Sequence, residues 1–355
     1  MPNKISKNTL TYLEKIITED YNSSLADELF NEYCDLAPIT KSSLGKKYTH
    51  DNSFDFLKLI RNEFLQKDEL NYFDNHLKKY FSNIELEDPK KYLNNPYYKL
   101  LLSLDIKNVL KDDKYLPYEV FQNNDKAIKK DNFYGDFTSF GYFNSEYFYQ
   151  RIIKDNKTWM SLIPHEINTM EKPISEAKGN VLTYGLGLGY FAFMCSSKEE
   201  VKSVTIIESD KEIIAFFNEN ILPNIETKNK IRIINTDAYS FKDVSNFDYI
   251  FVDIYHGEND GLECMLKFND IDFKELEPHY WIETSILTYF KRLVVTSLNE
   301  LFINSDYIDL GEETFEDSII NRTKSYIQKT YKKIETENID YLLSIQGLKE
   351  LIKSI

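Results

Sequence analysis

Glycine, proline and cysteine are all scarce in this chain. The first two shortages argue against a loop-rich all-β fold, and the third argues against a disulfide framework. The 355 residues include only 11 glycines, 9 prolines and 3 cysteines, beside 26 tyrosines and 24 phenylalanines. A loop-rich all-β fold needs many glycines and prolines for its turns, so the composition favours long helices and aromatic packing. The length is sufficient for two domains that each have a core.

The cysteines exclude a disulfide framework and a structural zinc site. They are odd in number and far apart, and none belongs to a CxxC pair. No histidine or further cysteine stands near them at the spacing of zinc ligands. We therefore expect Cys34, Cys195 and Cys264 to be free thiols in a reducing compartment, and we expect no metal.

Basic residues are also fewer than acidic ones. Lysine and arginine number 43 against 58 aspartates and glutamates, which gives a net charge of −15. Nucleic-acid binding depends on basic side chains that neutralise phosphates, so no nucleic-acid partner is expected. A cationic or small neutral substrate suits the acidic field better.

Long apolar runs are also missing. The longest uncharged apolar stretch, Val181 to Cys195, is too short to cross a membrane and is interrupted by glycines. The first 30 residues lack the basic and then apolar design of a signal peptide. We therefore expect a cytoplasmic protein with no membrane partner.

Residues 1–130 are predicted to form a helical accessory domain, which could also serve as the interface of a homodimer. Asp88-Pro89 and Asn95-Pro96 each place a capping residue before a proline at the first helical position, which indicates two helix starts. The other indication is apolar residues at helical spacing. They form three groups: Leu10, Leu13, Ile16 and Ile17; Leu25, Leu29, Tyr33 and Leu36; and Phe54, Leu57, Ile60 and Phe64.

The segment 131–163 is unusually aromatic and contains NFYGDFTSFGYFNSEYFYQRI. Two glycines interrupt it, which predicts a hairpin or an ordered loop. A helix is then expected to begin near Asn144 or Ser145. Such aromatic density is typical of a core or an interface, and a ligand-lining role is the alternative.

Residues 131–355 are predicted to hold an α/β domain with a helical C-terminal extension. Four runs are almost wholly apolar and are expected to be strands: NVLTY, SVTIIES, KIRIINTD and FDYIFVDI. Helical segments separate the first three, and AYSFKDVSN leaves room for only a turn or two of helix before the fourth. This alternation indicates a parallel sheet covered by helices on both faces.

Helices are also expected on both sides of these strands. One is predicted at 166–178, before the first strand, and a long one from Ile282 to Leu301, followed by two more. The only candidate for a fifth strand is HYWIETSI, which runs directly into the long helix.

Three of the 11 glycines lie within five positions, in VLTYGLGLGYFAF, which suggests a close approach of the backbone to something else. Parallel sheets bind ligands at the carboxyl ends of their strands. The first strand ends in this glycine turn, and the others end in Glu208, Asp237 and Asp253. A glycine turn before a helix offers backbone amides to an anionic group, and Glu208 stands where an acid holds ribose hydroxyls. The arrangement predicts a nucleoside-type ligand.

Two other nucleotide motifs fit less well. A P-loop is excluded, because no Lys-Ser or Lys-Thr follows the glycines. A dinucleotide fingerprint would place its last glycine where Tyr190 stands, and that side chain works against a pyrophosphate without excluding it.

The combined pattern resembles the class I S-adenosylmethionine-dependent methyltransferases over about residues 160–262. The resemblance consists of G-x-G-x-G, an acid after the second strand, Asp-Ala after the third and Asp after the fourth. VLTYGLGLGY, VTIIESD and FDYIFVDIYHG are most similar to the spermidine-synthase-like branch. The resemblance implies a doubly wound, mostly parallel, Rossmann-like sheet, although the family's usual C-terminal strand pair is not found in the sequence.

The resemblance also implies that S-adenosylmethionine is the cofactor and that two groups of residues bind it. The first group is the glycine turn, which would contact the methionine part: Tyr184, Gly185, Leu186, Gly187 and Gly189. In the second group, Glu208 would hold the ribose hydroxyls with Ser209 beside it. Asp237 would accept from the adenine amine, and the Ala238 amide would face the ring.

Three residues after the fourth strand are the implied catalytic positions. Asp253 would lie beside the sulfonium of the cofactor and orient or deprotonate the acceptor. Tyr255 and His256 would face the acceptor, and His256 as a general base competes with its interpretation as an ordinary loop histidine.

These roles predict methyl transfer to a small or peptidic acceptor. Aminopropyl transfer is one alternative, since the acidic loop GENDGLE suits a diamine. Against it, spermidine synthases carry an acid where this chain has Leu188, and a second Asp where it has His256. The other alternative is an interaction protein that binds the cofactor without turnover.

Overall fold

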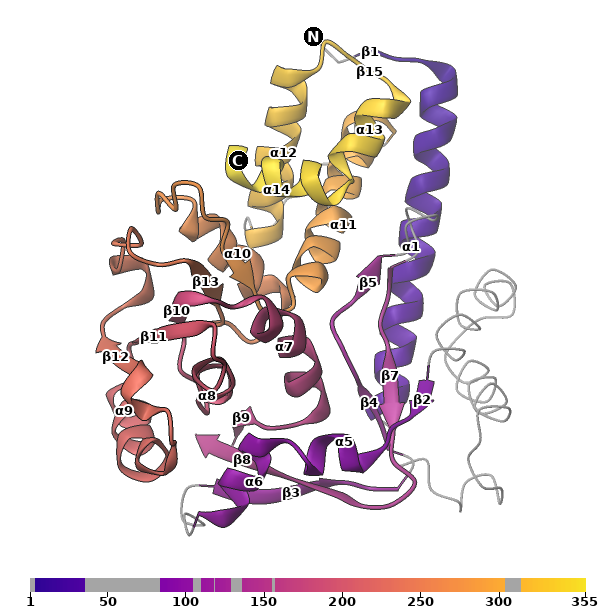
Figure 1. The fold of residues 1–355 in the computed structure, drawn as a ribbon. Helices are drawn as coiled ribbons and strands as arrows, with labels where there is room; N and C mark the ends of the chain where they lie inside the picture. The colour runs from indigo at the N-terminus through magenta and orange to yellow at the C-terminus, as the bar shows by residue number, and fades with distance from the viewer. Residues whose placement is uncertain are drawn as a thin grey trace, which may run out of the picture.

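The computed structural model describes residues 4–35, 84–104, 110–117, 119–128, 136–154, 157–303 and 314–355. Figure 1 shows the arrangement of its elements. The group of apolar residues at 54–64 that predicted a helix lies outside the described residues.

A five-stranded parallel sheet is the centre of the molecule. Its strands lie in the order β12-β11-β10-β13-β14, so the chain starts in the middle, moves outward to one edge and then crosses to the other. This is the doubly wound, Rossmann-like arrangement. All four predicted strands are confirmed, with these bounds: β10 Gly179–Tyr184, β11 Val201–Glu208, β12 Ile231–Asn235 and β13 Tyr249–Val252.

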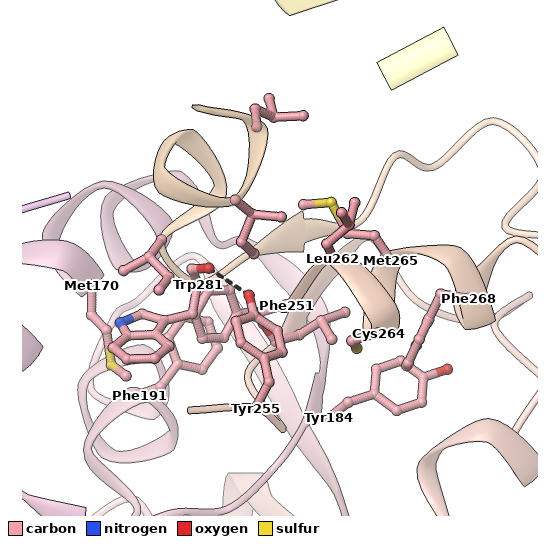
Figure 2. Packing of buried hydrophobic residues seen from close by; sticks show 14 of the residues in the cluster. Met170, Tyr184, Phe191, Phe251, Tyr255, Leu262, Cys264, Met265, Phe268 and Trp281 are labelled. Carbon is pink, nitrogen blue, oxygen red and sulfur yellow. Dashed lines mark hydrogen bonds between the residues drawn. The ribbon is translucent and has the colours of Figure 1, made fainter. Parts of the chain in front are cut away.

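Helices cover both faces of the sheet, as predicted. Thr183 pairs with Phe251 and Tyr184 pairs with Val252, so Tyr184 and Phe251 point to opposite faces. The ring of Phe251 stacks on that of Phe191 with the ring centroids 4.2 Å apart. The ring of Tyr184 meets that of Phe268 edge-on, with the centroids 4.9 Å apart (Figure 2). Phe191 belongs to α8 (Tyr190–Ser196) and Phe268 to α10 (Glu258–Phe268), and α7 (Pro164–Glu176) packs against α8.

The connections on the two sides of β12 differ in length and in helix content. After β11 the chain forms α9 (Lys211–Phe216), a π-helical turn η1 (Phe217–Ile221), and the 3₁₀ turns η2 (Leu222–Asn224) and η3 (Lys228–Lys230). Between β12 and β13 only the 3₁₀ turn η4 (Ala238–Ser240) occurs, which confirms the prediction of a turn or two of helix.

The predicted fifth strand exists but is only two residues long. β14 (His279–Tyr280) pairs in parallel with β13, and the chain then enters α11 (Glu283–Phe302). Among the described residues no C-terminal strand pair joins this sheet. The last described strand, β15 (Lys333–Ile334), instead pairs with β1 (Lys4–Ile5) at the other end of the chain.

In the part of the chain that the structure describes, three helices follow α11, where the sequence predicts two: α12 (Phe315–Thr330), α13 (Thr336–Leu342) and α14 (Ile345–Ser354). The N-terminal helix α1 (Lys7–Asp35) contacts α11 and α13, so it lies beside the C-terminal helices (Figure 1). Its residues Leu13 and Ile16 are fully buried, which confirms the first predicted apolar helix face.

The described part of 84–161 contains much more β structure than the sequence predicted. Helices α5 (Pro89–Leu93) and α6 (Pro96–Ser103) are confirmed, and Asp88 and Asn95 cap them. The prediction of a helix near Asn144 or Ser145 is wrong, because β8 begins at Tyr147. Aromatic and β-branched residues favour an extended strand there, and β8 pairs antiparallel with β3 and β9. The strands are β2 (Ile84–Leu86), β3 (Leu110–Tyr115), β4 (Val120–Gln122), β5 (Ala127–Ile128), β6 (Asp136–Phe137), β7 (Phe140–Tyr142), β8 (Tyr147–Lys154) and β9 (Lys157–Ser161).

This region is joined to the parallel-sheet part through the start of α11. Ile282, before the helix, has no side-chain acceptor that could cap it. Asp125, from the loop after β4, accepts hydrogen bonds from the N–H groups of Thr284 (3.0 Å) and Ser285 (2.9 Å) instead. Burial raises the pKa of the Asp125 carboxyl.

Candidate functional site

A cavity of about 500 Å³ opens at the carboxyl ends of β10, β11 and β13. Its walls also include the first turn of α7 and the residue after β14. Ligand cavities in enzymes have this order of size. Among the residues predicted to bind a ligand, those that line it are Gly185, Leu186, Gly187, Glu208, Ser209, Asp253, Tyr255 and His256.

The three glycines of the turn serve two different purposes. Gly185 has φ +100°, and a Cβ there would lie 1.9 Å from the backbone oxygen of Asp253. Gly189 has φ +86°, and its Cβ would lie 2.2 Å from the ring of Phe217. Gly187 has φ +53°, but its Cβ would meet nothing closer than a methionine sulfur at 3.9 Å. Gly185 and Gly189 therefore allow close packing, while Gly187 keeps the turn open to the cavity.

Glu208 is fixed by the backbone around it. The N–H of Leu186 donates to Oε2 of Glu208 at 3.0 Å, and the N–H of Asp210 donates to Oε1 at 2.7 Å. Two hydrogen bonds hold the carboxylate at the cavity wall, and its remaining lone pairs stay able to accept from a ligand. Within the described part of the chain, the N–H groups of Gly187 and Leu188 have no acceptor.

Four residues of the predicted set do not line the cavity. Tyr184 is buried in the opposite face of the sheet, and its hydroxyl donates to the carbonyl of Phe241 at 3.0 Å. Gly189 packs against the ring described above. Asp237 is exposed and caps η4, accepting from the N–H of Ser240 at 3.0 Å, and Ala238 begins that turn. Their binding of a ligand stays a prediction.

Tyr255 and His256 lie at the cavity in different ways. The Tyr255 hydroxyl donates to the backbone oxygen of Trp281, so its ring forms a wall (Figure 2). Burial raises the pKa of that hydroxyl, so the hydroxyl stays protonated near neutral pH and is poorly suited to act as a general base. His256 stands at the exposed rim, and its Nδ1 lies 3.4 Å from Oδ2 of Asp260. The catalytic role of each stays a prediction.

Asp253 ends β13 and reaches the cavity as a half-buried carboxylate. Its N–H completes the sheet by donating to the carbonyl of Tyr184 at 2.8 Å. Among the described residues its side chain has no hydrogen-bond partner. Burial raises the pKa of Asp253 to about 7.

A further cavity carboxylate, Glu166, is missing from the sequence prediction. It occupies the first turn of α7, and burial, together with the charge of Asp253, raises its pKa to about 8. An acid in the first turn of a helix normally balances the helix dipole, so the sequence carries no signal of a site there. Only the packing of α7 against the strand ends brings it to Asp253.

Trp281, which follows β14, is another wall residue that the sequence did not indicate. Its N–H donates to the carbonyl of Val252 at 3.0 Å, and its Nε1 donates to Oγ1 of Thr169 at 2.9 Å. The Tyr255 hydroxyl donates to the backbone carbonyl of Trp281 (Figure 2), so hydrogen bonds hold both the backbone of Trp281 and its indole.

The charged side chains that line the cavity are predominantly acidic. Among the described residues that line it there is no lysine or arginine, whereas four are acidic: Glu166, Glu208, Asp210 and Asp253. Such a lining favours a ligand with positive charge. The described residues contain no cluster of side chains that could hold a metal ion. No helix among them has the length and apolar character to cross a membrane.

No family model matches the chain, and no curated protein matches it either. Several solved structures align with it, among them those of two bacterial proteins. The YcgJ protein from Bacillus subtilis is 18% identical over 50% of this chain and 86% of its own, with a TM-score of 0.23. MnmC2 from Aquifex aeolicus is 14% identical over 79% of this chain and 99% of its own, with a TM-score of 0.28. Both likenesses are too distant to bear on activity.

Proposed function

We propose that this protein transfers a methyl group from S-adenosylmethionine to a small or peptidic acceptor. One observation carries the proposal: the open glycine turn, Glu208 and Asp253 end three adjacent parallel strands and line one cavity. The resemblance to the methyltransferase motifs requires the glycine turn, Glu208 and Asp253 to lie in one cavity. Residues that end three separate strands need not meet in this way.

The cavity fits the cofactor in size and charge. S-adenosylmethionine carries a cationic sulfonium and a cationic ammonium, which suit an acidic lining without basic side chains. The free N–H groups of Gly187 and Leu188 suit its carboxylate. The anchored carboxylate of Glu208 suits two ribose hydroxyls.

When bound, the cofactor would supply an electrophilic methyl group, so the protein has mainly to align an acceptor and exclude water. Asp253 is the residue best placed for the acceptor. Its carboxylate opens to the cavity, and a pKa of about 7 suits a group that takes a proton near neutral pH.

Glu208→Ala is expected to weaken the binding of S-adenosylhomocysteine by about ten- to a hundredfold, since two hydrogen bonds to a charged group would be lost. Because Leu186 also donates to Glu208, the change could act through the turn. Glu208→Gln retains an acceptor for that amide and separates the two effects.

Titration calorimetry measures these affinities, and Glu212→Ala is the matched control, an exposed acid of α9 that does not line the cavity. The control is expected to bind like the wild type. Unchanged affinity in Glu208→Ala would remove Glu208 from the cofactor site.

Aminopropyl transfer predicts a different cofactor preference. Leu188 lines the cavity where spermidine synthases carry an acid for the amine of decarboxylated S-adenosylmethionine. Without that acid the amine loses a charge-assisted hydrogen bond, worth about 1.5–3 kcal/mol. We expect S-adenosylmethionine to bind more tightly than its decarboxylated form, and no spermidine to form from putrescine. Parallel calorimetry of both forms decides, since the reverse preference would favour the aminopropyl alternative.

Binding without turnover is the remaining alternative. Labelled S-adenosylmethionine incubated with the protein and a cell extract distinguishes it from methyl transfer, because only turnover moves the label to an acceptor. The same extract with Asp253→Asn is expected to give little labelled product while cofactor binding persists.

A further inference from the structure

The acceptor side of the cavity contains two carboxylates whose charge nothing in the described structure compensates. Neither the Glu166 nor the Asp253 side-chain carboxylate accepts a hydrogen bond from a described residue, yet both line the cavity and each has its pKa raised by burial. A buried carboxylate without a partner is costly, and two close together are more so. Such a pair is suited to a ligand that brings the missing positive charge.

The neighbours of Glu166 do not supply that charge. His165, adjacent in the chain, is half-buried, and loss of contact with water lowers its pKa to about 4, so it is neutral at physiological pH. The other titratable groups facing the cavity are Glu208, Asp210, Tyr190, Tyr255 and the rim residue His256.

Glu166 lies on the side of the cavity where Trp281 stands. Two residues of the same helix contact the indole: the ring centroid of His165, which precedes Glu166, lies 5.9 Å from that of Trp281, and Thr169, three residues after Glu166, accepts from its Nε1. Glu208, by contrast, belongs to β11, on the other side of the glycine turn. A carboxylate beside an indole ring is a favourable setting for an ammonium group, which gains both ion pairing and a cation–π contact.

We propose that Glu166, Asp253 and Trp281 form a subsite for a protonated amine, so that the acceptor class of this protein is a primary amine. This inference rests on the proposed function and deepens it. On binding, the ammonium breaks one N–H bond and a carboxylate forms one O–H bond. The electron pair stays on nitrogen, so a neutral amine able to accept a methyl group results.

The raised pKa values assist that proton transfer. An alkylammonium has a pKa of about 10.4, and glutamate has an ordinary value of 4.5, so transfer between them is unfavourable by about six pKa units. A Glu166 pKa of about 8 reduces the difference to between two and three units.

Titration calorimetry with n-hexylamine and 1-hexanol tests the subsite, since the two differ in the charged head group. The protein is measured at pH 8, both alone and saturated with S-adenosylhomocysteine, which lacks the sulfonium. We expect the amine to bind at least about tenfold more tightly than the alcohol. Glu166→Gln should abolish most of that preference and leave S-adenosylhomocysteine affinity within about twofold.

Glu171→Gln, an exposed acid on the same helix, is the matched control and should change neither affinity. Repeating the amine titration at pH 7.5 in buffers of different ionisation enthalpy gives a second readout. The wild type should release more protons on amine binding than Glu166→Gln does.

Three results would overturn the subsite: equal binding of amine and alcohol, an undiminished preference in Glu166→Gln, or equal loss of S-adenosylhomocysteine and amine affinity. The last would assign Glu166 to the cofactor. If S-adenosylhomocysteine does not bind at all, the proposed function fails, while the comparison on the protein alone still tests the amine subsite.

Discussion

Gly185→Ala is expected to cost about 4 kcal/mol or more of the free energy of unfolding, and Gly187→Ala only about 1 kcal/mol. The first change places a Cβ 1.9 Å from the backbone oxygen of Asp253 at φ +100°, and backbone cannot move aside as a side chain can. The second needs φ +53°, which alanine tolerates with modest strain, and its Cβ would have space.

Urea denaturation of both variants measures the difference. Circular dichroism on each variant checks that the remaining structure is native. Since Gly187 faces the cavity, its alanine variant should fold yet bind S-adenosylhomocysteine more weakly. Similar costs for the two variants would contradict the close approach of β10 to β13 at Gly185.

Glu166→Gln is expected to raise the free energy of unfolding at pH 8.5 by about 2 kcal/mol and to leave it unchanged below about pH 4. In the folded protein the pKa of Glu166 is about 8, against 4.5 as its ordinary value. Between these values the folded state holds a proton that the unfolded state has released, so wild-type stability falls as pH rises through this window. Glutamine does not ionise, and the variant escapes that loss.

The full shift would correspond to about 5 kcal/mol, and water in the cavity screens part of it, which is why a smaller gain is expected. Urea denaturation at pH 4, 6 and 8.5 measures the trend. Glu171→Gln serves again as control and should stay within about 0.5 kcal/mol of the wild type throughout. A Glu166→Gln variant that is less stable than the wild type at pH 8.5 would mean that the carboxylate has a partner.

The parallel sheet could be predicted because its signals are local. Each of the four long strands is an apolar run bounded by polar residues, and the glycine cluster marks the turn after the first. The helix caps at Asp88 and Asn95 are local in the same sense, and they too were correctly placed.

The wall of the cavity could not be predicted, because it depends on contacts between distant segments. In the sequence, Glu166 cannot be distinguished from an ordinary acid in the first turn of a helix. Only the packing of α7 in the folded protein brings it to the cavity. Trp281 lies in HYWIETSI, the candidate fifth strand, but the sequence does not show that the pairing of β14 with β13 brings it to the cavity. In the opposite direction, Tyr184 stands next to the glycine turn in the chain, but strand alternation turns its side chain to the far face of the sheet.

The β structure between 110 and 161 was missed for a related reason. Its strands are short and pair across long separations, as β3 does with β8. Aromatic residues at 147–149 fit a helix face about as well as a strand in the sequence alone, and the pairing decides between them.

The capping of α11 by Asp125 has a consequence for local opening of the protein. The N–H groups of Thr284 and Ser285 are hydrogen-bonded only to a carboxylate from another part of the chain. Their exchange with deuterated water therefore depends on that loop leaving the helix, a smaller event than global unfolding. Lys126, next to Asp125, forms a 3.3 Å ion pair with Glu258 at the start of α10, so the same departure also breaks that ion pair. The loop after β4 thus links the protection of the first turn of α11 to an ion pair at the start of α10.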